Sequence, residues 1–511
     1  MQKRIKIPKI NIKKLINNLN KSKKEKIIIE INKNKISREK LYKDILRTQN
    51  YLISIGTKKN HKIVSLLENS YEQILLFLAT LGLGATWVPL GNYKKGIGLN
   101  YILSLIKPQF ILIRKNKIND IPINFKKNLK IIKDKTIFKN KINKIKKVIF
   151  SSNVNTILFT SGTTGPPKGV IVNDKMLIAS SYATGIASDS NGNDRYLLWE
   201  SLHHIGGIEI LILCLLKFSS LVIIKKFSAK KFWKQNIKYK ITVLHYLGGI
   251  LDILIKQPKT IFDKKHSIKI AFGAGARKET YSIFKKRFNI PLREVYGMTE
   301  ASSFTTINFK NHIGSIGQVL PWFKVKIINS KNGIGEIAIT SKDKNLITKG
   351  YFKDYKSTKN LLVNNLLYTG DIGKFDKHQN LYYIGRKKDS IRVKGENISS
   401  WEIESNLNEH INISESAVLP VKSDIGEEDI VALLLLKKRN KINIKNFANH
   451  FKSILPKNYN PRYWAVVKNF PRTPTYRIDK KLIDTSKIRF YDYSINEFRF
   501  INRKQFGLLD H

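Results

Sequence analysis

Short runs of β-branched and other apolar residues recur between residues 62 and 275 of this 511-residue chain, and a stretch with helical character separates each run from the next. The runs are KIVSLL at 62–67, QFILIR at 109–114, TILFT at 156–160, SLVIIK at 220–225 and KIAFGAG at 269–275. Strands that alternate with helices form largely parallel sheets, which those helices cover. The sequence therefore predicts an α/β fold for this part of the chain.

The pattern changes past residue 314, where strands follow one another closely. Gly, Asn and Asp turns separate KVKIIN at 324–329, GEIAIT at 335–340 and LYYIGR at 381–386. This spacing predicts a small β-rich subdomain.

A new set of elements is expected beyond residue 386, with helices at about 400–408 and 444–455 and strands at 414–420 and 429–437. We therefore predict a large N-terminal region of several subdomains at 1–386. A small, mobile α+β C-terminal domain is expected at 387–511, joined to that region by the charged turn GRKKD.

The most apolar stretch of the chain, ILLFLATLGLGATWVPLG at 74–91, approaches the length of a membrane span. Glycines and a proline interrupt it, so we expect a buried helix followed by a short strand, and no transmembrane segment. The basic N-terminus lacks the uninterrupted apolar core of a secretory signal. The single cysteine, Cys214, excludes internal disulfides and Cys-rich metal sites. These features predict a cytoplasmic protein.

The formal net charge is +55, from 93 Lys and Arg against 38 Asp and Glu, and such a charge is typical of proteins with a polyanion partner. The lysines are dispersed among Ile and Asn, however, as in the 115–150 segment, and they form no single basic stripe. Since A/T-rich codons raise Lys, Asn and Ile together, base composition explains the charge without a nucleic-acid function. We expect salt-dependent, non-specific adhesion at most, and no specific nucleic-acid partner.

The segment TILFTSGTTGPPKGVIV at 156–172 leads from an apolar strand into a loop of glycines, hydroxyls and one cation, Lys168. Such a loop can wrap phosphate oxygens, because its glycines permit unusual backbone dihedrals. It is not a Walker A loop, since that spacing requires Gly at 167 and Ser or Thr at 169, where this chain has Pro167 and Gly169. On composition alone, an ordinary surface turn stays open.

The string SGTTGPPKG resembles the phosphate-binding signature of the adenylate-forming superfamily, which contains acyl-CoA synthetases, adenylation domains and luciferases. Further signatures of that superfamily follow in order over most of the chain: SLHHIGG at 201–207, FGAGA at 272–276, YGMTE at 296–300, GSIGQVLPW at 314–322, KGYFKD at 349–354, YTGDIGKFD at 368–376, GRKKDSIRVKGENISSWEIE at 385–404 and PRTPTYRIDK at 471–480. The resemblance implies an AMP-forming acid–thiol ligase that activates a carboxylic acid with ATP and then transfers the acyl group to coenzyme A.

The resemblance also assigns residues to the nucleotide. It implies that Tyr296 stacks on adenine, that Thr299 contacts the α-phosphate and that Glu300 helps to hold Mg²⁺. Asp371 would bind the ribose hydroxyls, and Arg386 would add a donor there. Taken alone, the two acidic residues could equally be a solvated and a turn-capping carboxylate. The nucleotide- and CoA-binding set that the resemblance implies is Thr160, Ser161, Gly162, Thr163, Thr164, Gly165, Lys168, Gly273, Ala274, Gly275, Tyr296, Gly297, Thr299, Asp371, Arg386, Lys394 and Gly395.

The resemblance places the 201–207 segment beside the acyl pocket, with His204 near the substrate carboxylate. His203 and His204 are adjacent and cannot share a helix face as metal ligands four residues apart do, so zinc is not expected. The segment also lacks the aspartate with which amino-acid-activating members bind an α-amino group, which disfavours an α-amino acid substrate. A structural role for the histidines stays open.

Adenylation brings a carboxylate to a phosphate anion, so Mg²⁺, hydroxyls and a cation must stabilise the charge that develops. The resemblance implies that the C-terminal domain then rotates about the hinge residue Lys388. Rotation would bring Lys394, Gly395 and Glu396 to the thiol channel.

The last motif departs from the family pattern, because Tyr476 and Arg477 stand where the family has glycine and lysine. Arginine keeps a permanent cation, but its planar fork differs from an ammonium group. Either Arg477 acts directly, or Lys480 or Lys481 acts instead, or adenylation is impaired. With Arg477, the catalytic residues expected from the resemblance are Thr299, Glu300, Lys168 and His204.

Within the superfamily, the ending TPTYRIDK and the run YLGGILDIL at 246–254 resemble crotonobetaine/carnitine–CoA ligases. Four alternatives to a CoA ligase stay open. Three share the fold: an acyl-AMP ligase that loads an acyl-carrier protein, a luciferase-like oxygenase and an adenylate-binding remnant without catalysis. The fourth is a nucleic-acid-binding protein, which the charge alone suggests.

Overall fold

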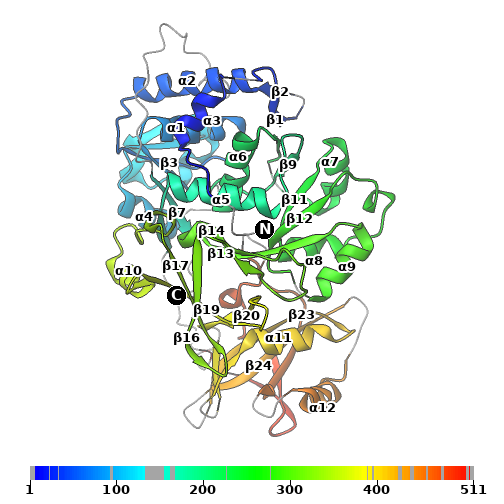
Figure 1. Cartoon of the computed structure of the whole chain (residues 1–511). Coiled ribbons are helices and arrows are strands. Elements are labelled where there is room, and N and C mark those ends of the chain that lie inside the picture. The colour runs from blue at the N-terminus through cyan, green and yellow to red at the C-terminus, as the bar shows by residue number, and fades with distance from the viewer. Residues whose placement is uncertain are drawn as a thin grey trace.

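The structure is a computed structural model that describes residues 6–21, 23–32, 34–91, 96–132, 155–160, 167–225, 227–276, 278–387, 390–393, 396–423, 428–437, 442–455, 459–473, 477–501 and 506. Two large sheets and the helices around them form the upper part of the molecule, and the C-terminal residues form a smaller body below (Figure 1).

The larger sheet has nine strands in the order β15-β14-β13-β12-β11-β9-β10-β1-β2. Their bounds are β1 (Ile27–Ile31), β2 (Asn34–Ser37), β9 (Arg195–Leu198), β10 (Ser220–Ile223), β11 (Val243–Leu247), β12 (Ile270–Ala274), β13 (Leu292–Met298), β14 (Ser303–Ile307) and β15 (Gln318–Val319). Neighbours from β13 to β1 pair in parallel, whereas β2, β14 and β15 add antiparallel edges. The prediction of a largely parallel sheet is confirmed.

The second sheet has six strands in the order β6-β5-β3-β4-β7-β8. Their bounds are β3 (Lys62–Ser65), β4 (Thr86–Pro89), β5 (Phe110–Ile113), β6 (Leu129–Ile131), β7 (Asn155–Thr160) and β8 (Lys168–Asn173). All of its pairs are parallel except β7 with β8, which is antiparallel. The segment between β7 and β8 is the predicted phosphate loop.

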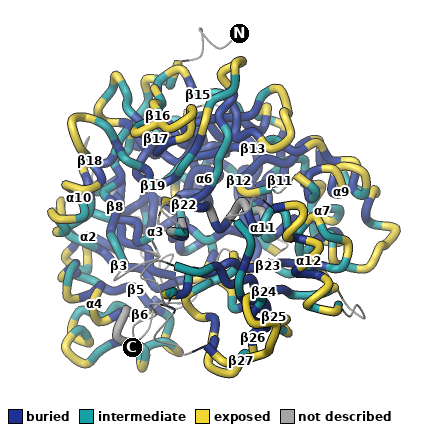
Figure 2. The backbone as a smooth tube through the Cα atoms, turned by 90° about the horizontal axis from the view of Figure 1, so that it is seen from below, coloured by how far each residue is buried: buried dark blue, intermediate teal, exposed yellow. Residues whose placement is uncertain are grey.

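Helices lie between the two sheets and on their outer faces. The inner layer is α3 (Tyr71–Gly82), α5 (Asp174–Ala187) and α6 (Ile205–Lys217), with α1 (Ile12–Asn18) and α2 (Arg38–Ser54) beside it. Outer helices are α7 (Phe232–Lys238), α8 (Gly248–Lys256) and α9 (Lys278–Phe288) on the nine-stranded sheet, and α4 (Gly96–Ile106) on the other. In Figure 2 the inner elements are mostly buried, while α7 and α9 expose their outward faces.

Strand alternation directs side chains to these layers. On β9, Tyr196 and Leu198 belong to the core between the sheets, and Leu197 belongs to the core under α7, α8 and α9. Both faces are apolar, as in parallel sheets that helices cover on each side. The cores of the region thus follow from the β-branched runs in the sequence.

The apolar 74–91 stretch forms most of α3 and then β4, as predicted. Ser70 caps α3 by accepting a hydrogen bond from the Gln73 amide at 3.2 Å. Among the described residues, every helix is too short or too polar to cross a membrane.

The β-rich subdomain is a sheet of β16 (Phe323–Lys331), β17 (Ile334–Ser341), β18 (Leu362–Val363), β19 (Leu366–Phe375) and β20 (Leu381–Arg386), with α10 (Tyr355–Leu361) at its side.

The C-terminal domain follows and is α+β, as predicted. It comprises a hairpin of β21 (Ser390–Val393) and β22 (Glu396–Ser399), a sheet of β23 (Ile413–Lys422), β24 (Glu428–Leu436), β25 (Tyr463–Val467), β26 (Arg489–Asp492) and β27 (Glu497–Phe500), and the helices α11 (Ser400–Glu409) and α12 (Ile444–Ile454). This domain has its own apolar clusters on both faces of its sheet.

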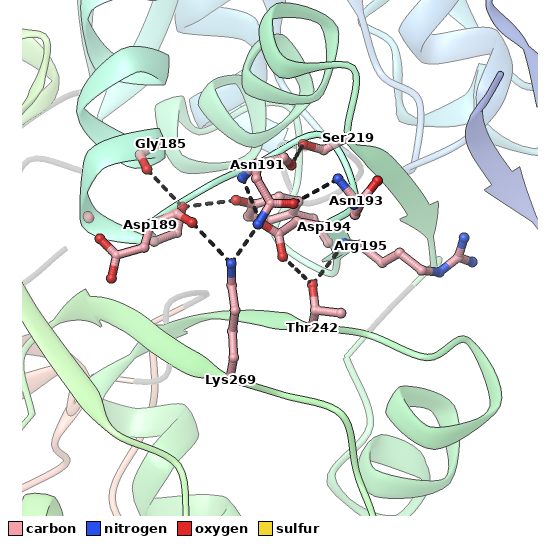
Figure 3. Close-up of polar contacts among 12 residues, drawn as sticks. Gly185, Asp189, Asn191, Asn193, Asp194, Arg195, Ser219, Thr242 and Lys269 are labelled. Atoms are coloured by element: carbon pink, nitrogen blue, oxygen red, sulfur yellow. Dashed lines mark hydrogen bonds and ion pairs between the residues drawn. The ribbon is translucent and has the colours of Figure 1, made fainter.

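A polar network fixes the amino ends of β9, β11 and β12 (Figure 3). The Asp194 carboxylate accepts hydrogen bonds from Lys269 Nζ at 2.9 Å, from Thr242 Oγ1 at 2.8 Å and from the Asn191 amide at 2.7 Å. The Arg195 amide in turn donates to Thr242 Oγ1 at 3.0 Å. These contacts hold the loop before β9 to the neighbouring strands at their amino ends. The candidate site lies at the opposite ends of these strands, their carboxyl ends.

Candidate active site

The predicted site residues gather at the carboxyl ends of β12 and β13. Gly273 and Ala274 end β12, and the run from Tyr296 to Glu300 ends β13 and begins the short helix η7 (Thr299–Ala301). Open α/β sheets bind ligands outside the carboxyl ends of their strands, in a crevice between the loops that follow those strands. The fold thus positions two predicted motifs together.

Tyr296, Asp371 and Arg386 form one contact group. Tyr296 Oη donates to Asp371 Oδ2 at 2.7 Å, and Arg386 Nε lies 2.8 Å from Asp371 Oδ1. Asp371 on β19 faces Arg386 on β20 in the ladder, and its own amide donates to Thr369 Oγ1 at 3.0 Å. Burial and the adjacent carboxylate raise the pKa of Tyr296 well above its usual value, so its hydroxyl keeps its proton.

Glu300, Tyr351 and Lys168 form a second group. The buried Glu300 accepts a hydrogen bond from Tyr351 Oη at 2.8 Å, and Lys168 Nζ lies 5.1 Å from the centre of the Tyr351 ring. Burial raises the pKa of the Glu300 carboxyl, while the charges of Arg386 and Lys168 oppose that rise. The two groups therefore share Arg386 as an electrostatic neighbour.

Tyr351 was not predicted as a site residue, although its motif was recognised. It reaches the site because the 348–352 segment lies along β8. The Phe352 amide donates to the Gly169 carbonyl at 2.7 Å, and the Ile171 amide donates to the Gly350 carbonyl at 3.1 Å. The Thr348 amide also donates to the Glu300 carbonyl at 2.8 Å. This segment thus links β8 to η7.

The predicted phosphate loop is flanked by paired strand residues. Thr160 on β7 faces Lys168 on β8, and both are partly exposed. The antiparallel pair places the two ends of the loop side by side next to Tyr351. The predicted residues Ser161, Gly162, Thr163, Thr164 and Gly165 lie outside the described residues.

Two glycines allow backbone segments to approach closely beneath the site. A Cβ on Gly273 would lie 1.9 Å from the Tyr246 carbonyl oxygen, and a Cβ on Gly297 would lie 1.6 Å from the Ser303 carbonyl oxygen. Both distances are far shorter than van der Waals contact. These positions therefore require glycine for reasons of packing, whichever ligand binds above them.

Glu294 supports the turn that follows β12 and was not predicted. Its buried carboxylate accepts hydrogen bonds from Tyr246 Oη at 2.6 Å, from the Ala276 amide at 3.2 Å and from the Gly275 amide. Burial raises the pKa of Glu294 to about 7, and the charge of Arg477 opposes this rise. Glu294 therefore feels the charge of Arg477, a residue of the C-terminal domain.

The histidine segment follows β9 and leads into α6. His203 is buried, and its Nδ1 lies 2.5 Å from Ser201 Oγ. His204 is the residue before the first turn of α6, and the two imidazole rings lie 4.1 Å apart. The predicted residue His204 is thus at the same sheet edge as Tyr296, at the amino end of a buried helix.

A buried acid lies behind the histidines. Glu200 Oε2 is 3.2 Å from His245 Nδ1, and both side chains are at least nine-tenths buried. Burial raises the pKa of Glu200 to about 7 and lowers the pKa of His245 to about 4. The imidazole is therefore uncharged at neutral pH.

Arg477 belongs to a turn of the C-terminal domain. Arg472 and Ile478 form a β-bridge at its base, and Arg477 is exposed. Lys480, an alternative cation in the same motif, instead donates to Glu404 Oε1 at 2.7 Å and to Ser400 Oγ at 2.9 Å. The two partners of Lys480 lie on α11 of its own domain.

Three further predicted residues, Lys388, Lys394 and Gly395, lie outside the described residues. Within the described part of the chain, His, Cys, Asp and Glu side chains form no cluster of three or more that could hold a metal ion.

A cavity of about 170 Å³ lies at the amino ends of β12 and β13, at the other end of the strands from the predicted residues. It is lined by Asp189, Lys269, Ile270, Pro291, Leu292, Arg293 and Asn311.

Comparison with known proteins agrees with the motifs. A crotonobetaine/carnitine–CoA ligase of Salmonella heidelberg is 26% identical to this chain over 481 residues, which are 86% of this chain and 91% of that protein. ATP-bound MatB from Rhodopseudomonas palustris has a TM-score of 0.85 at 21% identity, covering 93% of this chain and 98% of that one.

The fold is also similar to that of o-succinylbenzoate CoA synthetase, MenE, from Bacillus subtilis, solved with an acyl-adenylate. The TM-score is 0.80 at 22% identity, over 92% of this chain and 97% of that one. The AMP-binding enzyme model matches residues 17–352, which are more than half of the chain. The resemblance read from the motifs is confirmed, and the chain belongs to the AMP-binding enzyme family.

Proposed function

We propose that this protein is an ATP-dependent acid–CoA ligase. The carboxylate of the acid attacks the α-phosphorus of ATP, pyrophosphate leaves, and the thiol of CoA then attacks the acyl-adenylate and releases AMP. The observation that carries the proposal is the convergence of Lys168, Tyr296, Glu300, Asp371 and Arg386 around the carboxyl end of β13. Separate motifs contribute these residues, and their arrangement suits a nucleotide with a phosphate chain.

Tyr296, Asp371 and Arg386 would hold the nucleoside. The Asp371 carboxylate can accept hydrogen bonds from ribose hydroxyls, and its contacts with Tyr296 and Arg386 fix its orientation before ATP arrives. Preorganisation of this kind lowers the entropy lost on binding. The Tyr296 ring would stack on adenine, and Arg386 would add a donor to the ribose.

The residues around Glu300 fit a magnesium ion carried by the nucleotide. Mg²⁺ is usually held by one or two carboxylates together with substrate phosphates and water, and the described part of the site offers Glu300 as such a ligand. The ion would act there as a Lewis acid on phosphate oxygens. Lys168 and Thr299 would contact the phosphates beside it, and Tyr351 would orient the Glu300 carboxylate.

Arg477 would supply the cation that bridges the carboxylate and the α-phosphate. Its charge acts on Glu294 at the site edge, whereas Lys480 is engaged with Glu404 and Ser400. The engagement of Lys480 within its own domain favours Arg477 over Lys480 for this role. His204 would lie near the carboxylate of the acid.

The second step would follow rotation of the C-terminal domain about Lys388. That rotation would withdraw Arg477 and bring the segment with Lys394 and Gly395 to the thiol. Such a domain movement lets one active site present two sets of groups in turn. The 387–511 segment would move as one body.

The acid is proposed to be a small organic or fatty acid, and the names of the relatives make carnitine and crotonobetaine the first candidates. The test is to incubate the protein with ATP, Mg²⁺ and pools of carboxylic acids, with CoA, with an acyl-carrier protein or with neither, and to measure pyrophosphate, AMP and thioester. Pyrophosphate that depends on the acid, with thioester formed on CoA, supports the proposal. Thioester on the carrier protein alone would replace CoA as the acceptor, and the absence of pyrophosphate with every acid would contradict the proposal.

A further inference from the structure

Glu415 lies where the C-terminal domain meets the N-terminal region. Its side chain on β23 is 10% exposed, and both of its oxygens accept hydrogen bonds from Arg472, one of them from Nη1 at 3.1 Å. Lys256, the last residue of α8, places Nζ 3.5 Å from Glu415 Oε2. One carboxylate therefore pairs with a cation from each part of the molecule.

Arg472 is at the base of the turn that carries Arg477. Besides the bridge between Arg472 and Ile478, the Thr473 amide donates to the Arg477 carbonyl at 2.9 Å, and the Arg477 amide donates to Thr473 Oγ1 at 3.1 Å. These bonds close the turn on itself, so a displacement of Arg472 displaces Arg477.

Charges of the C-terminal domain interact with opposite charges of the N-terminal region at two places. Lys256 contacts Glu415, and the charge of Arg477 reaches Glu294, which holds the 274–276 turn at the site edge. We propose that Glu415 is a positioning residue for adenylation, which bridges Lys256 and Arg472 and thereby holds the Arg477 turn against the nucleotide site. This inference rests on the proposed function, and it adds a contact that favours one of the two domain arrangements.

Removal of the Glu415 charge has a directional consequence. In Glu415→Gln, Lys256 and Arg472 keep their charges and face each other across the domain boundary without a carboxylate between them. Two cations that both contact the Glu415 side chain repel each other once its charge is removed, so the arrangement that brings Arg477 to the site becomes less populated. The rotated arrangement proposed for the second step would separate these cations, so the substitution would not disfavour it.

The two half-reactions of the enzyme separate this effect from a general loss of structure. Because hydrogen bonds to charged groups are strong, we expect Glu415→Gln to lower the rate of acid-dependent pyrophosphate formation roughly tenfold. The Lys256 side chain is 44% exposed, and exposed ion pairs are weak, so Lys256→Met is expected to lower it about twofold to fivefold. Both variants should convert a synthetic adenylate of the preferred acid to its CoA thioester at the wild-type rate.

Two further variants serve as controls. Lys256→Arg preserves the charge and should restore pyrophosphate formation to near the wild-type rate. Lys259→Met removes the same charge from an exposed position three residues further along and should have no effect. Equal losses in both half-reactions, or no loss in either, would overturn the proposal.

A distance measurement tests the contact without any catalytic activity. Cys214 is the only cysteine and is buried, so spin labels can be placed at Lys231→Cys on the N-terminal region and Lys445→Cys on the C-terminal domain, both exposed positions. We expect one dominant distance in the labelled wild type and a broader or shifted distribution with Glu415→Gln. An unchanged distribution would refute the role of Glu415 even if the ligase is active. A wild type that forms no pyrophosphate would refute the proposed function and leave the distance result to decide the contact.

Discussion

Replacement of Asp371 by Asn keeps the shape of the side chain and removes one negative charge from the centre of the proposed nucleoside site. The carboxylate is 4% exposed, accepts from Tyr296 Oη at 2.7 Å and lies 2.8 Å from Arg386 Nε. An Asn amide can still accept from Tyr296, but its NH₂ group opposes the donors of Arg386. We therefore expect weaker ATP binding together with a modest loss of stability.

The magnitude follows from the number of charged contacts. A hydrogen bond to a charged group contributes about 1.5–3 kcal/mol, so losing one ribose contact weakens ATP binding roughly 10- to 150-fold. The pair with Arg386 adds little to stability, because the Arg386 side chain is 42% exposed and solvent screens its charge. The free energy of unfolding should fall by about 1–2 kcal/mol, mainly because the hydrogen bond from Tyr296 then goes to a neutral amide oxygen and no longer to a carboxylate.

The assay compares two nucleotides by calorimetric titration without acid or CoA. ATP carries both ribose hydroxyls, whereas 2′,3′-dideoxy-ATP carries neither. Wild type should bind ATP more tightly than the dideoxy analogue, and Asp371→Asn should abolish most of that difference. Refutation would be a variant that binds ATP within twofold of wild type, or that loses equal affinity for both nucleotides.

Three other predictions concern packing, orientation and pH. Gly297→Ala places a methyl group against the Ser303 carbonyl and should destabilise the protein by several kcal/mol, seen as a lower chemical-denaturation midpoint; an unchanged midpoint would contradict the clash. Tyr351→Phe removes the hydroxyl that donates to Glu300 and should slow pyrophosphate formation about fivefold to tenfold with unchanged binding of AMP; unaltered kinetics would show that Tyr351 has no orienting role. Burial raises the pKa of Glu200 to about 7 in the folded state. The folded state therefore binds more protons than the unfolded state between about pH 4.5 and 7. The protein loses the corresponding stability as the pH rises through that window. The wild-type free energy of unfolding minus that of Glu200→Gln should therefore fall by about 3 kcal/mol between pH 4 and pH 8, and a difference independent of pH would contradict the shift.

Much of the fold could be predicted from local sequence. The run at 269–275 forms β12 and the apolar stretch at 74–91 forms α3 and β4, because strand composition, capping and turn residues act over a few positions. By contrast, β1 pairs with β10, and no local pattern indicates a partner almost two hundred residues away. Long-range pairing depends on the assembled layers.

The candidate site was predicted as a set of motifs and not as a set of contacts. Tyr296 and Asp371 were both singled out, but their hydrogen bond depends on how the β-rich subdomain sits over β13. Tyr351 and Glu294 were missed, since an uncharged tyrosine and a glutamate within a strand resemble ordinary core residues until their partners are placed. The contact of Lys256 with Glu415 depends on the arrangement of two domains and has no sequence signature.

The most direct test of the central claim follows an oxygen atom. The protein is incubated with ATP, Mg²⁺, CoA and a carboxylic acid labelled with ¹⁸O in its carboxyl group, and AMP is analysed by mass spectrometry. Formation of an acyl-adenylate transfers one carboxylate oxygen to the α-phosphate, so the account predicts AMP that contains one ¹⁸O atom together with the acyl-CoA. Unlabelled AMP, or ADP with labelled phosphate, would contradict it.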